Sequence, residues 1–551
     1  MNDVLTRHAR ALRWSVGAVV LALPALALAI PEGPEPNTPE WAAREAANYA
    51  RTLEGPSEQL SPAFQQRLQA QNAANEAEWL MRGISDPDWF SPQSGNTNLT
   101  PLCTSWMLQC AGDPFRYPGV DPFYTDEAEV TPFVIYDDGC ARLSGRVWAP
   151  KGSAAGANLP AVVIETGSIQ APETLYWWMA QALVRSGYAV ATFDVRGQGR
   201  SDQQTPDGTQ GSNANSTVFW DNLVNVIDFF RSNPVAPYPH NAACEGSYAT
   251  EVTPFNPIHD RIDRERLGLA GHSLGATGVS VVQAYGAEGA EPWPGLLDTD
   301  NPVDVIVAWD SLRAPGAASG STPAVVPRVP AMGQTSEYGI GGTAKMAPPN
   351  IEGHKGGYNG WKEAGVPVYQ LTIQGSTHFE WSLIPTFPST SWCPEVVDGQ
   401  CAGGWGRPLA EHYSLAWFDR WLKAPGEPGF DTADARLLAD ADWVERYSFY
   451  SKSARAYASR DGAFQLCEDI RAGCEVAQPP VVIVDPPPPP EAPPSPPPSN
   501  PPPAQPPPTI QAAPAPAPAV GSSSGEGRFG AGSLAWGLLP WVALRRRLRW
   551  P

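Results

Sequence analysis

Short apolar segments alternate with longer amphipathic segments through the middle of the chain. The short segments have the length of buried strands, whereas in the longer ones apolar residues recur at helical spacing. The predicted strands cover residues 130–136, 141–149, 160–165, 188–194, 267–271, 303–309, 329–337 and 366–373, and the predicted helices cover 175–186, 218–232, 274–285 and 409–422. This alternation predicts an α/β fold with a mainly parallel sheet that helices cover on both faces.

The first residues have the pattern of a secretory signal. Arg7, Arg10 and Arg13 precede an apolar run over 14–28, which ends in small residues. A basic start, a short apolar run and a small-residue end are typical of a signal peptide, here with cleavage after Ala29. The alternative is a helix that stays in the membrane as an anchor.

The last residues form a three-part segment. The small residues 521–525 precede an apolar stretch over 529–544, which is followed by the arginine cluster 545–549. Such a stretch can cross a membrane with its arginines on the cytoplasmic side. It resembles the glycine-rich C-terminal sorting signals of Gram-negative bacteria, in which a membrane protease removes the apolar tail. The alternative is a permanent anchor. Both ends predict an exported protein that is secreted or held at the cell surface or outer membrane.

Proline usage shortens the part of the chain that can fold. Of the 62 prolines, 21 lie within residues 479–518, a stretch that reads as a stiff extended spacer. The segment 39–82, rich in Ala, Glu and Gln, has the pattern of helices. The predicted organisation is a signal peptide (1–29), a helical extension (30–125), a catalytic α/β domain (126–455), a disulfide-bearing segment (456–478), a linker (479–526) and a sorting or anchor segment (527–551).

Charge and composition exclude two classes of protein. The chain has 37 Lys and Arg against 57 Asp and Glu, a net charge of −20, which would repel a nucleic-acid backbone. Hydrophobic residues make up 42%, including 21 Trp, so a disordered chain is excluded as well.

Eight cysteines in an exported chain favour disulfides over metal ligation. Close spacing suggests three pairs, and the remaining two cysteines would make a fourth. The suggested pairs are Cys103–Cys110, Cys393–Cys401, Cys467–Cys474 and Cys140–Cys244. Eight cysteines allow 105 connectivities, so spacing alone leaves the pairing open.

The most specific motif is the sequence Gly-His-Ser-Leu-Gly at 271–275. It follows a predicted strand and opens a predicted helix, which is the setting of a G-x-S-x-G nucleophile turn. Small residues are needed two positions before and after the serine, because the backbones crowd there. Ser273 is therefore the predicted nucleophile.

A serine hydroxyl needs a base to remove its proton. In hydrolases with this turn, the histidine follows the serine in the chain, which leaves His354, His378 and His412. His378 lies on a loop after the last predicted strand, whereas His412 falls inside a helix and His354 in a glycine-rich loop. His378 is the predicted base.

Two acids could orient this histidine, and the residues alone leave the choice open. Asp310 and Glu337 each follow a predicted strand. The oxyanion hole requires two backbone N–H groups, which we assign to Leu274, after the nucleophile, and to Ser168, in the loop after strand 160–165.

These motifs resemble the α/β-hydrolase superfamily, and within it the secreted cutinase-like polyester hydrolases and related bacterial lipases. The resemblance covers roughly residues 130–423. In those enzymes the G-H-S-x-G turn is followed by a strand that ends in a substrate-contacting Trp, then by a strand that ends in the acid, and then by a G-x-S-H-F loop. The matching positions are 271–275, Trp309, 333–337 and 375–379. The resemblance thus implies that Glu337 is the acid and that Trp309 binds substrate.

The function implied is hydrolysis of carboxylic esters, from small esters or lipids to polyester, through an acyl-enzyme and without a metal or organic cofactor. A serine peptidase or amidase is the alternative enzyme, since the same residues cleave amides. A binding protein that keeps the hydrolase fold is the alternative outside enzymes. Glu in place of Asp, and an insertion between the histidine and helix 409–422 that contains Trp392 and Trp405, depart from the family's pattern.

Overall fold

The computed structural model describes residues 34–53, a few isolated positions between 62 and 85, and residues 121–168, 171–212, 214–340, 342–382, 395–397, 400–402 and 405–474. The predicted signal peptide, the linker, the terminal sorting segment and Cys103, Cys110 and Cys393 lie outside the described residues. Among the described residues, no helix is both long enough and apolar enough to cross a membrane.

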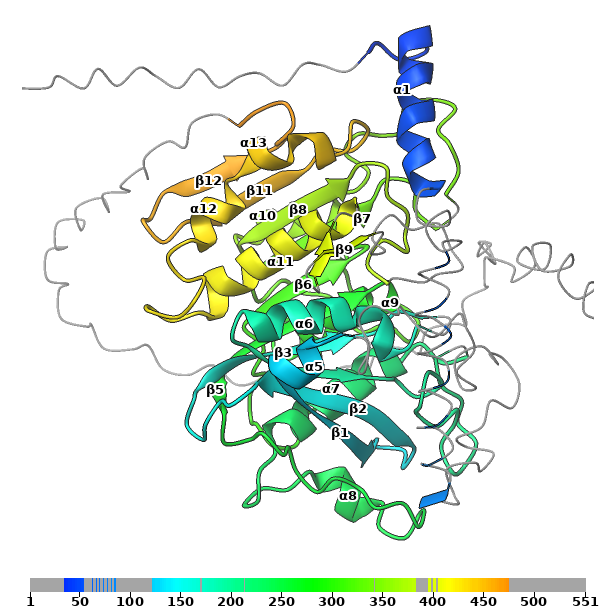
Figure 1. Cartoon of the computed structure of the whole chain (residues 1–551), viewed down its shortest axis with the longest axis vertical. Helices are drawn as coiled ribbons and strands as arrows, with labels where there is room; N and C mark the ends of the chain where they lie inside the picture. Colours follow the sequence, from blue (N-terminus) through cyan, green and yellow to red (C-terminus); the bar gives the residue numbers. More distant parts are fainter. Residues whose placement is uncertain are drawn as a thin grey trace, which may run out of the picture. The chain divides into compact units, whose positions relative to one another are not determined.

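A single ten-stranded sheet forms the centre of the catalytic part, in the order β1-β2-β4-β3-β5-β6-β7-β8-β11-β12 (Figure 1). The six central strands, β4-β3-β5-β6-β7-β8, pair in parallel. The strands at both edges, β1-β2 and β11-β12, pair antiparallel with their neighbours. The strands are β1 (Ala128–Tyr136), β2 (Arg142–Pro150), β3 (Leu159–Glu165), β4 (Ala189–Phe193), β5 (Ile262–His272), β6 (Val305–Trp309), β7 (Ala331–Ser336), β8 (Val368–Ile373), β11 (Ala454–Ala458) and β12 (Phe464–Cys467). A separate small ribbon pairs β9 (Glu395–Val397) with β10 (Gln400–Ala402).

Helices cover both faces of this sheet, as the sequence pattern predicts. One hydrophobic cluster contains α6 and α11, and the other contains α7, α9 and α10. The helices are α1 (Pro39–Ala50), α5 (Phe123–Asp126), α6 (Trp177–Arg185), α7 (Val218–Arg231), α8 (Pro239–Ala243), α9 (Leu274–Val282), α10 (Gly356–Glu363), α11 (Gly406–Leu422), α12 (Ala433–Leu437) and α13 (Asp440–Trp443). Within β3, Val162 and Ile164 pack into the first cluster, whereas Ala161 and Val163 pack into the second. This alternation is what a strand buried on both faces requires.

The sheet extends further toward the C-terminus than expected. The domain boundary placed at residue 455 falls inside β11, which pairs with β8, and β12 continues the same sheet. The described part of segment 456–478 therefore contributes strands to the catalytic sheet. Two disulfides are present among the described residues, Cys140–Cys244 and Cys467–Cys474, and both match the suggested pairing.

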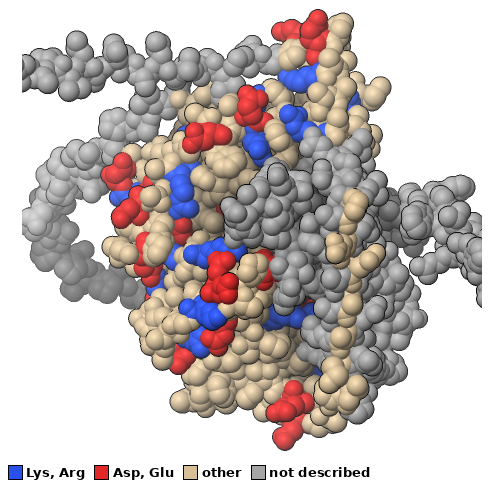
Figure 2. Space-filling model, in the orientation of Figure 1, with Lys and Arg blue, Asp and Glu red and all other residues tan. Residues whose placement is uncertain are grey.

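Charged side chains on the surface are mostly interspersed. On the face in Figure 2, acidic and basic residues alternate over the described surface. Among the charged residues of the described part, several form ion pairs, such as Arg185 with Glu127 at 2.7 Å and Arg266 with Glu427 at 2.6 Å. Partly exposed pairs of this kind contribute little to stability, about 0–1 kcal/mol each.

Candidate active site

The predicted nucleophile lies on a sharp turn between β5 and α9. Ser273 has φ 59° and ψ −118°, a strained conformation for a residue with a side chain. Both glycines of the motif are sterically required. A Cβ on Gly271 would lie 2.3 Å from the carbonyl oxygen of Gly275, and a Cβ on Gly275 would lie 2.3 Å from that of Thr166. The turn is thus the G-x-S-x-G turn that the sequence predicts.

The predicted base lies within hydrogen-bond distance of this serine. Nε2 of His378 is 2.9 Å from Oγ of Ser273, and its Nδ1 is 2.6 Å from Oδ2 of Asp310. The backbone N–H and the hydroxyl of Ser336 also donate to the Asp310 carboxylate, each at 2.9 Å. Ser273, His378 and Asp310 thus form a continuous hydrogen-bonded chain from β5, the loop after β8, and the end of β6.

The charge of Asp310 determines which nitrogen of His378 carries the proton. Burial would raise the pKa of Asp310, but the hydrogen bond from His378, the electrostatic attraction of that side chain and the Ser336 N–H outweigh it, and the pKa is lowered. An ionised carboxylate can only accept a hydrogen bond. Nδ1 of His378 is therefore the donor, and Nε2 is left free to accept the proton of Ser273.

The acid favoured by the family resemblance lies elsewhere, which corrects the assignment to Glu337. The two carboxylate oxygens of Glu337 accept hydrogen bonds from the backbone N–H of Gly375 at 2.7 Å, from Asn48 Nδ2 and from the hydroxyl of Ser448. His378 is bonded to Asp310, the alternative acid. Both acids follow neighbouring parallel strands, and it is Asp310, at the end of β6 next to β5, that meets the histidine.

Trp309 also has a different environment from the one expected. It is fully buried, and its Nε1 donates to Ser414 Oγ at 3.1 Å. Its ring packs parallel to Tyr176, with centroids 6.5 Å apart. As the last residue of β6 it points into the core under α6 and α11, because side chains alternate along a strand. The expectation that this side chain contacts the substrate is therefore wrong.

The two residues assigned to the oxyanion hole lie at the same edge of the sheet as Ser273. Leu274 is the first residue of α9, where backbone N–H groups have no partner within the helix. Ser168 follows β3 by three residues, and β3 pairs with β5 so that Glu165 lies opposite Gly271. Both side chains are partly exposed. The assignment of their N–H groups stays a prediction.

A chain of hydrogen bonds joins His378 to the loop after β3 that contains Ser168. The sequence pattern did not reveal it. The carbonyl of His378 can only accept, so the contact of 2.8 Å to His272 Nε2 places the proton of His272 on that nitrogen. Nδ1 of His272 then accepts from the Tyr176 hydroxyl at 2.9 Å, and that hydroxyl accepts from Gly167 N–H at 3.0 Å. Burial and the nearby His378 lower the pKa of His272 to about 3, so it stays neutral.

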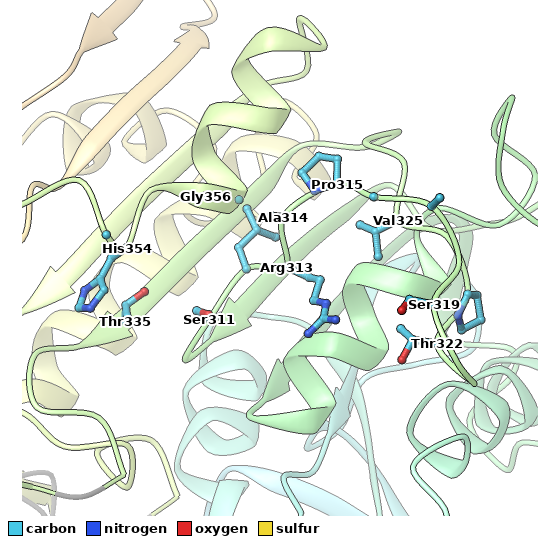
Figure 3. A pocket seen from close by; sticks show the side chains of 16 residues that line it. Ser311, Arg313, Ala314, Pro315, Ser319, Thr322, Val325, Thr335, His354 and Gly356 are labelled. Carbon is cyan, nitrogen blue, oxygen red and sulfur yellow. The ribbon is translucent and has the colours of Figure 1, made fainter. Parts of the chain in front are cut away.

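A cavity of about 480 Å³ adjoins the acid (Figure 3). Its lining includes Ser311, which follows Asp310, together with Arg313, Thr335 and His354. Ser273 and His378 are not among the lining residues. The cavity therefore does not by itself locate a substrate at the nucleophile.

We expect the buried Glu337 to give the protein a characteristic dependence of stability on pH. Burial raises the pKa of Glu337 in the folded state, and the hydrogen bonds from Gly375, Ser448 and Asn48 offset this only in part. Its ionisation therefore costs folding stability as pH rises from the unfolded pKa of about 4.3 through the folded pKa. Glu337→Gln cannot ionise, so its Tm should gain on that of the native chain between pH 4 and 8. Thermal unfolding of both proteins across this range checks the sign, and a constant or shrinking difference would contradict it.

The fold and the Ser–His–Asp chain together define the protein as a serine hydrolase of the α/β-hydrolase fold. Residues 138–290, which include Ser273 but end before Asp310 and His378, match the family described as X-Pro dipeptidyl-peptidase (S15 family). A search of curated proteins found no match to this chain.

Three of the solved structures that are similar to this chain differ in identity, coverage and TM-score. A hypothetical protein from Pseudomonas aeruginosa is 19% identical, covering 33% of this chain and 43% of that chain, with a TM-score of 0.23. An esterase from Pyrococcus furiosus is 15% identical over 34% and 52%, with a TM-score of 0.22. A ferulic acid esterase from Streptomyces cinnamoneus is 16% identical over 55% and 92%, with a TM-score of 0.30. The match thus spans about half the length of the first two, and these similarities are too low to assign an activity.

Proposed function

We propose that the protein is an exported serine hydrolase that cleaves carboxylic esters through an acyl-enzyme. The observation that carries the proposal is the chain Ser273–His378–Asp310, with contacts of 2.9 and 2.6 Å. His378 takes the proton of Ser273 through Nε2, and the serine oxygen attacks the ester carbonyl. The N–H groups of Leu274 and Ser168 stabilise the negative oxygen that forms.

The remaining steps return the enzyme to its starting state. The protonated His378 gives its proton to the departing alkoxide, which leaves an acyl group on Ser273. His378 then removes a proton from water, which attacks the acyl-enzyme. As the second tetrahedral intermediate collapses to release the carboxylic acid, the protonated His378 gives that proton to the oxygen of Ser273. Asp310 remains ionised and stabilises the imidazolium in both halves of the reaction.

Cleavage of peptide bonds is the second candidate, because the matched family is described by a peptidase activity. A dipeptidyl peptidase must bind the free α-ammonium of its substrate, which calls for an available carboxylate near the serine. Among the described residues, Asp310 is engaged by His378 and Ser336, and Glu337 by Gly375, Asn48 and Ser448. Glu165, which lies opposite Gly271 at the end of β3, is buried and keeps one carboxylate oxygen without a hydrogen-bond partner. Esters are the first candidate because the motifs resemble those of ester hydrolases, and lipid and polyester are the finer proposals that this resemblance suggests.

A substrate panel tests the proposal directly. We expect turnover of p-nitrophenyl esters, with a rate that depends on acyl length, and at most slow turnover of X-Pro p-nitroanilides at equal concentration. Triglyceride emulsion and polyester film extend the panel to the finer proposals. Turnover of the anilides alone would replace the esterase proposal with a peptidase. Binding of polyester film without turnover of any member would favour the non-enzymatic alternative.

A further inference from the structure

Helix α1 packs on the catalytic part through a face that is partly polar. Its buried residues are Trp41, Glu45 and Asn48, spaced by four and three positions on one face. Burial of a carboxylate and an amide is costly unless both are hydrogen-bonded. The partners of these two side chains therefore indicate what the helix holds in place.

Glu45 and Asn48 bond to segments from two distant parts of the sequence. Glu45 accepts hydrogen bonds from the Tyr338 hydroxyl at 3.0 Å, from the Lys345 backbone N–H at 2.5 Å and from the Tyr450 hydroxyl. Asn48 Nδ2 donates to the Tyr338 hydroxyl at 3.0 Å and to Oε2 of Glu337. The helix is thus tied to the loop that follows β7.

The same oxygen of Glu337 also holds the loop that carries the catalytic base. Oε2 accepts from the Gly375 backbone N–H at 2.7 Å, three residues before His378. The two loops are joined again by the backbone, from Tyr338 N–H to Ser376 oxygen and from His378 N–H to Gly339 oxygen, each at 3.1 Å. A shift of Glu337 would therefore be transmitted to the backbone of His378.

The end of α1 also directly contacts the loop after β8 that carries His378, residues 374–378, which we call the base loop. Gly375 has φ 62°, and a Cβ there would lie 2.9 Å from Arg51 Cδ and 3.1 Å from the backbone oxygen of Asn48. The Arg51 guanidinium stacks on the ring of Trp405 at 4.0 Å, and Trp405 Nε1 donates to the Gln374 carbonyl at 2.5 Å. The base loop thus lies against α1 on one side, and the His272 contact holds it on another.

We propose that Asn48 is a positioning residue for the base, acting through Glu337 and Gly375, and that helix α1 is a structural part of the active site. The inference rests on the proposed function, since it concerns the placement of His378 against Ser273. Asn48 touches neither the substrate nor a reacting atom. It holds the Glu337 carboxylate where that carboxylate can accept from Gly375.

The test compares Asn48→Ala with a control on the same helix. Thr38 caps the start of α1 by accepting from the Trp41 N–H at 3.1 Å, so Thr38→Ala should lower the Tm without altering the Glu337 contact. We expect Asn48→Ala in the full chain to lower kcat for a p-nitrophenyl ester about tenfold with KM within about twofold, because small displacements of a catalytic group are costly. Thr38→Ala should keep kcat within about twofold.

A second arm separates positioning from a general loss of structure. In a Glu337→Ala background, Asn48→Ala should add little to the loss of kcat, since both changes break one connection. Fully multiplicative effects, or an unchanged kcat in Asn48→Ala, would overturn the inference.

Hydrogen exchange of the backbone provides a readout that does not need activity. Asn48→Ala should speed exchange in residues 374–378 more than Thr38→Ala does. Equal exchange in the two variants would overturn the inference even if the native protein hydrolyses no ester. Absence of ester turnover in the native protein, with faster exchange in Asn48→Ala, would instead contradict the proposed function and leave the coupling of α1 to the base loop in place.

Discussion

Replacement of Ser273 by alanine should lower kcat/KM for a p-nitrophenyl ester by as much as about 10⁶-fold, the scale found when the nucleophile of a serine hydrolase is removed. The change removes the oxygen that His378 contacts at 2.9 Å, so no acyl-enzyme can form. A residual rate over water can remain, because the backbone N–H groups of the oxyanion hole are untouched. Steady-state kinetics with a highly purified variant measures the loss.

The fold of the Ser273→Ala variant should be nearly unaffected. Alanine takes the place of serine at the same strained φ of 59°, so the Tm should stay within a few degrees. Ser280→Ala is a matched control on α9, because this hydroxyl donates to the Ala276 carbonyl, accepts from the Arg313 backbone N–H at 3.3 Å and contacts no residue of the triad. The control should keep its activity within a few-fold. Full ester hydrolysis by the Ser273→Ala variant would refute the mechanism.

Replacement of Asp310 by asparagine should lower kcat by about 10⁴-fold, as the same change does in other serine hydrolases. If the amide nitrogen took the place of Oδ1, it would face the Ser336 N–H at 2.9 Å, a donor against a donor. The amide should therefore turn its nitrogen toward His378 Nδ1, which then has to accept. The proton would move to Nε2, and the histidine could no longer take the proton of Ser273.

The Asp310→Asn variant distinguishes a wrong tautomer from a disrupted site. Because Asn and Asp have nearly the same shape, the contact of the Ser336 backbone N–H and the fold should persist, and KM should change by only a few-fold. A pH–rate profile of kcat in both proteins is the measurement. Activity within tenfold of the native chain would show that Asp310 does not orient the base.

The nucleophile and the base could be predicted from the sequence, because local chemistry determines both. A Cβ at Gly271 or Gly275 would lie 2.3 Å from a backbone oxygen of the turn or of the neighbouring loop, so both positions require glycine. Such crowding appears in the sequence as a motif. His378 is the downstream histidine on a loop directly after a parallel strand. No long-range information is needed to place either residue at the edge of the sheet.

The acid could not be predicted, because its identity depends on contacts from distant parts of the chain. Asp310 and Glu337 end adjacent strands and are equivalent in sequence pattern. Glu337 is engaged by Asn48, 289 positions earlier, and by Ser448, 111 positions later. The prediction that Trp309 contacts the substrate was wrong for a related reason. The position of a residue at the end of a strand does not show which face of the sheet its side chain points to.

Most elements of the sheet were predictable, whereas some late elements were not. Helix α10 was missed because three of its eight residues are glycines, which disfavour helices, and the burial of Tyr358 and Trp361 stabilises it instead. Strands β11 and β12 are short and were read as a separate segment. Their place in the sheet is determined by pairing with β8, which a sequence pattern does not show.

One measurement tests most directly the central claim that Ser273, His378 and Asp310 act together. The rate of covalent labelling by a fluorophosphonate should be followed by mass spectrometry for the native chain, Asp310→Asn and Glu337→Gln. The amide oxygen of glutamine can still accept from Gly375 and Asn48, whereas its nitrogen replaces the oxygen that accepts from the Ser448 hydroxyl. The account predicts a label on Ser273, a rate that falls by several orders of magnitude in Asp310→Asn, and a rate within about threefold of native in Glu337→Gln. The reverse order of the two variants, or a label on another serine, would contradict it.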